Sequence, residues 1–233
     1  MNEHLFKPTT GMNFVSAPST LVELLQWRAK HQPNQQAYTF LLDGETEEAH
    51  LTYEELDQQA RAIGCWLQSL GVTEQRVLLL YPPGLEYVAA FFGCLYGGNI
   101  AVPAYPPRLK RPMPRLQAIV ASAQPVIALT TTSILSNLEQ RFAHSPALKA
   151  LRWLTIDNIP DGMETDWQEP PVTSDTLASL QYTSGSTGTP RGVMVSHGNF
   201  MHNLDLIHHG FKNNHKDIGV FWLPLYHDMG LGS

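Results

Sequence analysis

Apolar segments of strand length alternate with amphipathic helical segments along most of the chain. Buried strands are indicated by apolar runs at residues 76–81, 101–105, 125–130, 151–156 and 177–182. Between these runs, apolar residues recur at helical spacing. Apolar strands separated by helices predict an α/β fold of layered, mostly parallel sheets with flanking helices.

The expected helices carry start and stop signals. Thr20 precedes a helical pattern that begins at Leu21, and Thr52-x-x-Glu55 is a capping box that opens a helix ending at Gly71. Further helices are expected over 86–96, 116–123 and 134–142, and further strands over 37–42 and 193–195. Four aromatic residues are expected in the core: Phe91, Phe92, Tyr96 and Trp222.

An acidic, proline-bearing connector over 157–175 interrupts the alternation. It is either a subdomain boundary or a long surface loop, and the loop is the favoured interpretation. The total of 233 residues suits one large domain or two small ones.

Composition excludes several functional classes. The formal net charge is −6, so there is no basic excess with which to bind nucleic acid through bulk charge. Apolar residues make up 43% of the chain, which argues against disorder. No run of about 18 apolar residues and no basic segment followed by an apolar one at the N-terminus are seen, so we expect neither a transmembrane helix nor a signal peptide. Cys65 and Cys94 are expected to be buried free thiols, as in a cytoplasmic protein.

Histidines are frequent near the end of the sequence, with six between His197 and His227. None forms an i, i+4 pair with another, and no cysteine completes a tetrahedral set. Histidines on the surface of a helix therefore explain the run better than a metal site.

The candidate chemistry starts in a run of small, hydroxylated and glycine residues after the expected strand at 177–182. Such a run surrounds an anion with backbone N–H groups and hydroxyls, and Arg191 adds a cation suited to phosphate. A flexible hairpin loop explains the composition equally well, and no Walker A sequence is present. The candidate phosphate-binding residues are Thr183, Ser184, Gly185, Ser186, Thr187, Gly188 and Arg191.

The string LQYTSGSTGTPRGVMVSHG at 180–198 resembles the phosphate-binding motif of the adenylate-forming enzyme superfamily. The resemblance implies that this loop holds the β- and γ-phosphates of ATP and the leaving pyrophosphate. Arg191 stands where the family usually has lysine, which keeps the charge and changes the geometry.

A second string, FWLPLYHDMGL at 221–231, resembles the next motif of the superfamily, a strand that runs into a loop at the acyl pocket. Taken alone, its His-Asp pair is more simply a strand end with a surface histidine. The resemblance implies that His227 lines the active site as the candidate catalytic residue, and that His227, Asp228, Met229 and Gly230 border the acyl substrate.

Within the superfamily, three strings resemble those of fatty acyl-AMP ligases. They are YPPGLEYVAAFFGCLYGG at 81–98, AVPAYPPR at 101–108 and HDMGL at 227–231. This implies activation of a long-chain fatty acid with ATP and Mg²⁺ to acyl-adenylate and pyrophosphate, then transfer to an acyl carrier protein, as in polyketide assembly. An acyl-CoA synthetase or amino-acid adenylation domain of the same fold is the alternative. A non-catalytic module that binds acyl chains or a carrier protein is another.

Family members are longer than this chain. By resemblance, residues 1–233 are expected to be a partial N-terminal AMP-binding domain, without the C-terminal half and the small C-terminal domain. We therefore expect the chain by itself not to form acyl-adenylate. The basic stretch from Arg108 to Arg115 fits contact with an acidic carrier protein, although a solvated loop is the simpler interpretation.

Overall fold

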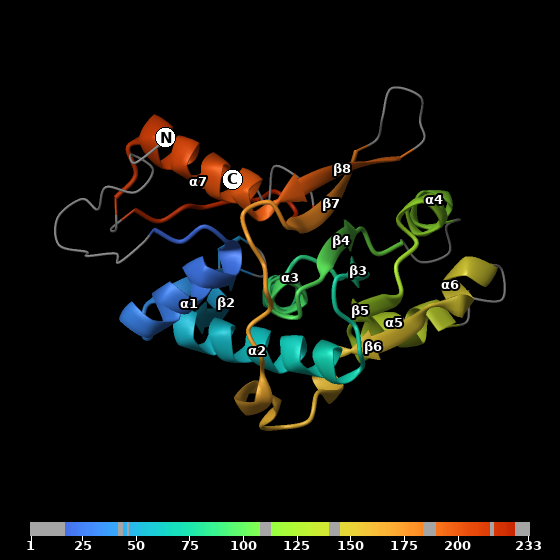
Figure 1. Ribbon diagram of the computed structural model, residues 1–233. Helices are drawn as coiled ribbons and strands as arrows, with labels where there is room; N and C mark the ends of the chain where they lie inside the picture. Colours follow the sequence, from blue (N-terminus) through green and yellow to red (C-terminus); the bar gives the residue numbers. More distant parts are fainter. Residues whose placement is uncertain are drawn as a thin grey trace.

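A six-stranded sheet forms the centre of the molecule (Figure 1). The computed structural model describes residues 17–41, 44–45, 47–107, 113–139, 145–183, 190–214 and 217–226. The strands are β3 (Arg76–Leu80), β4 (Ile100–Ala104), β5 (Ile127–Thr130), β6 (Arg152–Thr155), β7 (Leu177–Thr183) and β8 (Arg191–Ser196). Their order is β6-β5-β3-β4-β7-β8, and only β8 is antiparallel to its neighbour. The predicted mostly parallel sheet is confirmed.

Helices separate most of these strands, as the sequence predicts. They are α1 (Leu21–His31), α2 (Tyr53–Ser69), α3 (Leu85–Tyr96), α4 (Pro114–Ala123), α5 (Thr132–Glu139), α6 (Pro146–Ala150) and α7 (His197–Phe211). Both predicted N-caps are present, because Thr20 and Thr52 each form a capping box with a glutamate three residues later. Within the described residues, no helix is long and apolar enough to cross a membrane.

A small antiparallel sheet of β1 (Gln36–Leu41) and β2 (Glu47–Thr52) lies apart from the large one. The strand at β1 was predicted, and β2 was not. The sequence of β2, EEAHLT, has too few apolar positions to show the alternation of a half-buried strand. Its pairing with β1 is what gives it strand structure.

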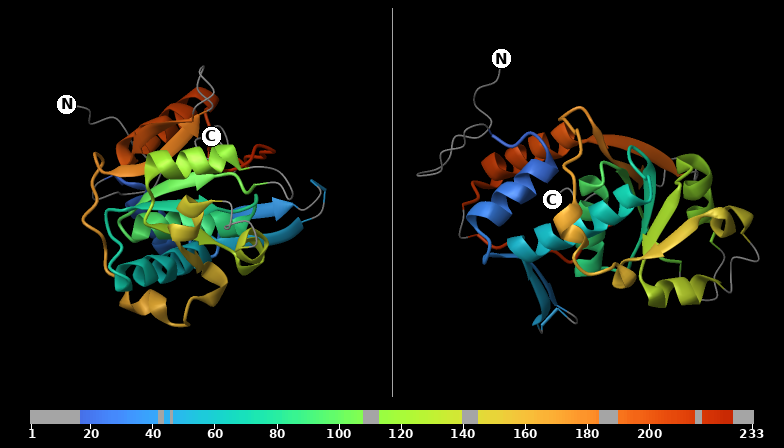
Figure 2. Two further views of the ribbon diagram at one scale, coloured as in Figure 1. Left: turned by 90° about the vertical axis from the view of Figure 1, so that its right-hand side faces the viewer. Right: turned by 60° about the horizontal axis from the view of Figure 1, so that its bottom comes forward.

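The central strands of the large sheet are buried on both faces, because their alternate side chains point to opposite sides. Val77 and Leu79 of β3 belong to a core that includes residues of α1, α2 and α3. Leu78 and Leu80 belong to a second core with residues of α4, α5 and α6. The right-hand view of Figure 2 shows α2 and α3 on one side of the strands and α4, α5 and α6 on the other. This explains why β3 is apolar at each position from Val77 to Leu80.

Two glycines allow α2 and α3 to pack closely. A Cβ atom at Gly64 would lie 2.9 Å from the backbone carbon of Tyr96, and one at Gly93 would collide with Ile63. Both of the predicted thiols, Cys65 and Cys94, are buried and free at this layer.

The acidic connector is attached to both α2 and α3. Trp167 Nε1 donates a hydrogen bond to the carbonyl oxygen of Tyr96 (2.8 Å), and the guanidinium of Arg61 lies 4.4 Å from the centre of the Trp167 ring. The chain then enters β7, which pairs with β4. Residues on both sides of the connector thus contribute strands to the same sheet.

Two expectations near residue 222 are wrong. Residues 221–225, expected to be a strand, have neither helical nor strand structure, because no described residue pairs with them as a neighbouring strand. Trp222, expected in the core, has 87% of its surface exposed. The other aromatic residues expected there lie in α3, where Phe91 and Tyr96 are buried and Phe92 is partly buried.

Candidate active site

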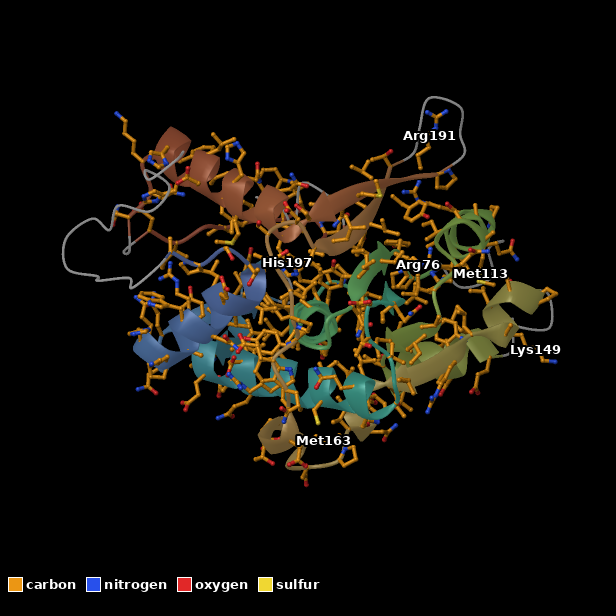
Figure 3. The ribbon with its side chains drawn as sticks, in the orientation of Figure 1. Arg76, Met113, Lys149, Met163, Arg191 and His197 are labelled. Atoms are coloured by element: carbon orange, nitrogen blue, oxygen red, sulfur yellow. The ribbon has the colours of Figure 1, made fainter. Side chains whose placement is uncertain are left out.

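The residues that flank the expected phosphate loop are paired in the β7–β8 hairpin. Thr183, the last residue of β7, lies opposite Arg191, the first residue of β8. Both are exposed, and Figure 3 shows the Arg191 side chain at the free end of the hairpin. A hydroxyl group and a guanidinium group therefore start from paired positions at this end. The other five candidates, Ser184, Gly185, Ser186, Thr187 and Gly188, lie outside the described residues.

The hairpin is attached to the parallel part of the sheet through β7. Ser179 pairs with Ala101 of β4, and its Oγ also donates a hydrogen bond to the Ala101 carbonyl oxygen (3.1 Å). Pro190 precedes β8, a position where the missing N–H of proline costs the sheet no hydrogen bond. The strand that carries Thr183 is therefore held by the buried centre of the molecule.

The second candidate segment reaches the same edge of the sheet. Because β4 and β7 are parallel neighbours, Tyr105, which follows β4, and Thr183, which ends β7, lie at the same edge of the sheet. The ring of Tyr226 packs on Tyr105, edge to face, with ring centroids 5.0 Å apart. Tyr226 is the residue before His227. The acyl-site candidates His227, Asp228, Met229 and Gly230 themselves lie outside the described residues.

Burial is the main cause that raises the pKa of Tyr226, and the neighbouring Tyr105 adds to it. The neutral form of Tyr226 is therefore favoured at this edge. Leu225 and Tyr226 are partly buried against the first core, which anchors the end of the segment. The arrangement places an apolar, aromatic surface beside a hydroxyl and a cation, which suits a ligand with an apolar part and an anionic part.

The sequence did not single out the contribution of Arg115. Its Nη2 donates a hydrogen bond to the carbonyl oxygen of Tyr182 (3.1 Å), the residue before Thr183. The signal for it was the basic stretch between the strand at 101–105 and the following helix, but spacing alone gives no partner for an arginine.

Metal ligands are not gathered at this edge in the part of the chain that is described. No group of three histidine, cysteine or acidic residues there is close enough to hold a metal ion.

His197 is buried, and its Nδ1 accepts a hydrogen bond from the backbone N–H of Leu21 (3.2 Å). Burial lowers the His197 pKa to about 4, with partial opposition from Glu23. This histidine therefore joins α7 to α1.

The family model described as AMP-binding enzyme matches residues 25–233. The chain belongs to the AMP-binding enzyme family. The match includes both candidate segments, and the β7–β8 hairpin and the Tyr105–Tyr226 contact lie within it.

Two curated relatives have names that describe ligases. One is the medium-chain-fatty-acid--[acyl-carrier-protein] ligase JamA of Moorena producens, 47% identical over 91% of this chain and 37% of its own length. Another is the long-chain-fatty-acid--AMP ligase FadD32 of Mycolicibacterium smegmatis, 35% identical over 94% of this chain and 35% of its own length. The chain thus spans little more than a third of these relatives.

A solved structure shows the same fold. It is a fatty acyl-adenylate ligase from L. pneumophila in complex with acyl adenylate and pyrophosphate, with a TM-score of 0.84 and 41% identity. The similarity covers 93% of this chain and 37% of that one. The mostly parallel sheet with helices on both faces is thus the fold of an adenylate-forming ligase.

Proposed function

We propose that the protein carrying this chain activates a fatty acid with ATP and passes the acyl group to an acyl carrier protein in the cytoplasm. One observation supports this proposal above the others. Thr183, Arg191 and the Tyr105–Tyr226 pair occupy the same edge of the sheet, which supports a phosphate site next to an apolar site. The names of the relatives give the matching chemistry, fatty acid ligation to AMP or to a carrier protein.

The proposed reaction has two steps. A carboxylate oxygen of the fatty acid attacks the α-phosphorus of ATP, the bond from that phosphorus to the β-phosphate bridging oxygen breaks, and pyrophosphate leaves. The thiol of the carrier protein, losing its proton, then attacks the acyl carbonyl carbon, and AMP leaves. In the first step two anions approach each other, so positioning and charge neutralisation account for most of the catalysis.

In this proposal the β7–β8 hairpin restrains the β- and γ-phosphates, which leave as pyrophosphate. Thr183 and the residues of 184–188 hold the β- and γ-phosphates with hydroxyl and N–H groups, and Arg191 supplies a guanidinium that binds them bidentately. Mg²⁺, bound with ATP, neutralises part of the phosphate charge. His227 lines the site beside the reacting carboxylate, and residues 228–230 border the acyl end.

The test is a product assay on the natural gene product that contains this chain. The protein receives ATP, Mg²⁺, a fatty acid, coenzyme A and a carrier protein bearing its thiol, and products are identified by mass spectrometry. Acyl-AMP and acylated carrier protein are expected. Acyl-CoA as the product would replace the proposed acceptor, and the absence of any acyl-AMP would refute adenylation. The 233-residue chain, run beside it, is expected to form no acyl-AMP.

A pair of arginine variants tests the phosphate site. Arg191→Ala is expected to raise the KM for ATP by about tenfold or more, because a hydrogen bond to a charged group contributes roughly 1.5–3 kcal/mol. Arg152→Ala is the control, because Arg152 is an exposed arginine on β6, at the opposite edge of the sheet from β8. Equal KM values for ATP in the two variants would refute a role for Arg191 in binding the phosphates of ATP.

A further inference from the structure

Helix α4 forms hydrogen bonds with both the backbone and the side chain of Tyr182. Arg115 Nη2 donates to the Tyr182 carbonyl oxygen (3.1 Å). The Tyr182 hydroxyl donates to Ser122 Oγ (2.8 Å). Arg115 and Ser122 are seven residues apart, so they lie on the same face of the helix and about 10 Å apart along its axis. Tyr182 therefore lies lengthwise against two turns of α4.

The same tyrosine also covers β8. Gly192 is the partner of Tyr182 across the hairpin, and a Cβ atom there would lie 3.0 Å from Cζ of the Tyr182 ring. The ring thus lies directly over the backbone of β8. Tyr182 contacts α4 and both strands of the hairpin, one residue before the Thr183–Arg191 pair.

Arg115 is exposed, and no ion pair of the described residues involves it. Its charged guanidinium group instead donates to the carbonyl oxygen of Tyr182, near the end of β7. A charged donor makes a stronger hydrogen bond to a carbonyl than a neutral one does. The contact fixes the direction in which the chain leaves the sheet toward residue 184.

We propose that Arg115 is a positioning residue for the phosphates of ATP. By holding the Tyr182 carbonyl, it fixes the Thr183–Arg191 pair at the place where the phosphates bind. This inference rests on the proposed function, and it adds a residue from outside both sequence motifs. Arg115 acts through Tyr182 and contacts no reacting atom.

The test compares Arg115→Ala, Arg115→Lys and the control Arg152→Ala in the natural gene product. Arg115→Ala is expected to raise the KM for ATP by up to about tenfold and to leave the KM for the fatty acid unchanged. The free energy of the one charged hydrogen bond that is lost sets the upper limit, because Arg115 acts on ATP only through Tyr182. Arg115→Lys should restore most of the ATP affinity, because an ammonium group also donates to a carbonyl. The control should match the unsubstituted protein.

Hydrogen exchange gives a second readout that does not depend on activity. In Arg115→Ala, amide exchange is expected to accelerate in the β7–β8 hairpin and not in β3 or β5. Equal losses for ATP and fatty acid, or unchanged exchange in the hairpin, would overturn the positioning role. If the unsubstituted protein forms no acyl-AMP while hairpin exchange still responds to Arg115→Ala, the proposed function fails and the mechanical role of Arg115 stands.

Discussion

His197 provides a measurable acid sensitivity of folding. It is the first residue of α7 and only 1% exposed, and its Nδ1 accepts a hydrogen bond from the backbone N–H of Leu21 at the start of α1. The ring nitrogen accepts this bond only while it carries no proton. Burial, the main cause, lowers the His197 pKa from 6.5 to about 4, and Glu23 of α1 opposes the shift.

The magnitude follows from proton linkage. Between pH 6.5 and about 4 the unfolded chain binds a proton at His197 that the folded chain does not. Stability is therefore complete above the unfolded pKa and is lost as pH falls through this window. One pH unit corresponds to about 1.4 kcal/mol, so the loss from His197 at pH 5 is roughly 2 kcal/mol.

The assay is urea unfolding at about pH 7.5 and about pH 5, which bracket the ordinary histidine pKa. His197→Asn keeps an acceptor oxygen near the position of Nδ1 and does not titrate. The unsubstituted protein is expected to lose roughly 2 kcal/mol more than this variant on acidification. His202→Asn, an exposed position on the same helix, should behave like the unsubstituted protein. Equal pH dependence with and without His197 would refute the assignment.

Three further predictions concern the layer formed by α2 and α3. Gly93→Ala is expected to lower the free energy of unfolding by about 1–3 kcal/mol in urea titrations, because the added methyl group collides with Ile63. Tyr96→Phe removes the hydroxyl that donates to the buried carboxylate of Asp57 (2.6 Å), and it should cost about 1–3 kcal/mol in the same titrations. Cys94, whose pKa is raised by burial, should resist iodoacetamide in the folded protein and react in urea, as peptide mass spectrometry will show.

The centre of the large sheet could be predicted from the sequence because its central strands are buried on both sides. Val77 and Leu78 enter different cores, and both positions must be apolar, so β3 appears in the sequence as a continuous apolar run. The helix starts were equally readable, because Thr20 and Thr52 form local capping boxes. Local signals of this kind need no knowledge of distant partners.

Elements that depend on a partner could not be predicted in this way. The strand β2 is polar and exists through its pairing with β1. The opposite error occurred at 221–225, where apolar residues predicted a strand that is not formed. High β-propensity produces no strand where the described residues provide no neighbouring strand. The hydrogen bond from Arg115 to Tyr182 joins residues 67 positions apart, and no periodicity in the sequence reports it.

The candidate site was found from its motif, and the structure adds a reason for the position of that motif. A strand parallel to β7 would need a long crossover connection before it could pair. The antiparallel β8 pairs with β7 without such a connection. The pairing of β7 with β8 therefore fixes Thr183 and Arg191 opposite each other. An arginine at the first position of β8 is held close to the hydroxyl that ends β7, while Tyr182 and Gly192 below them connect both strands to α4. In the proposed site, the cation is thus placed by the sheet itself before a phosphate arrives, which reduces the ordering that binding requires.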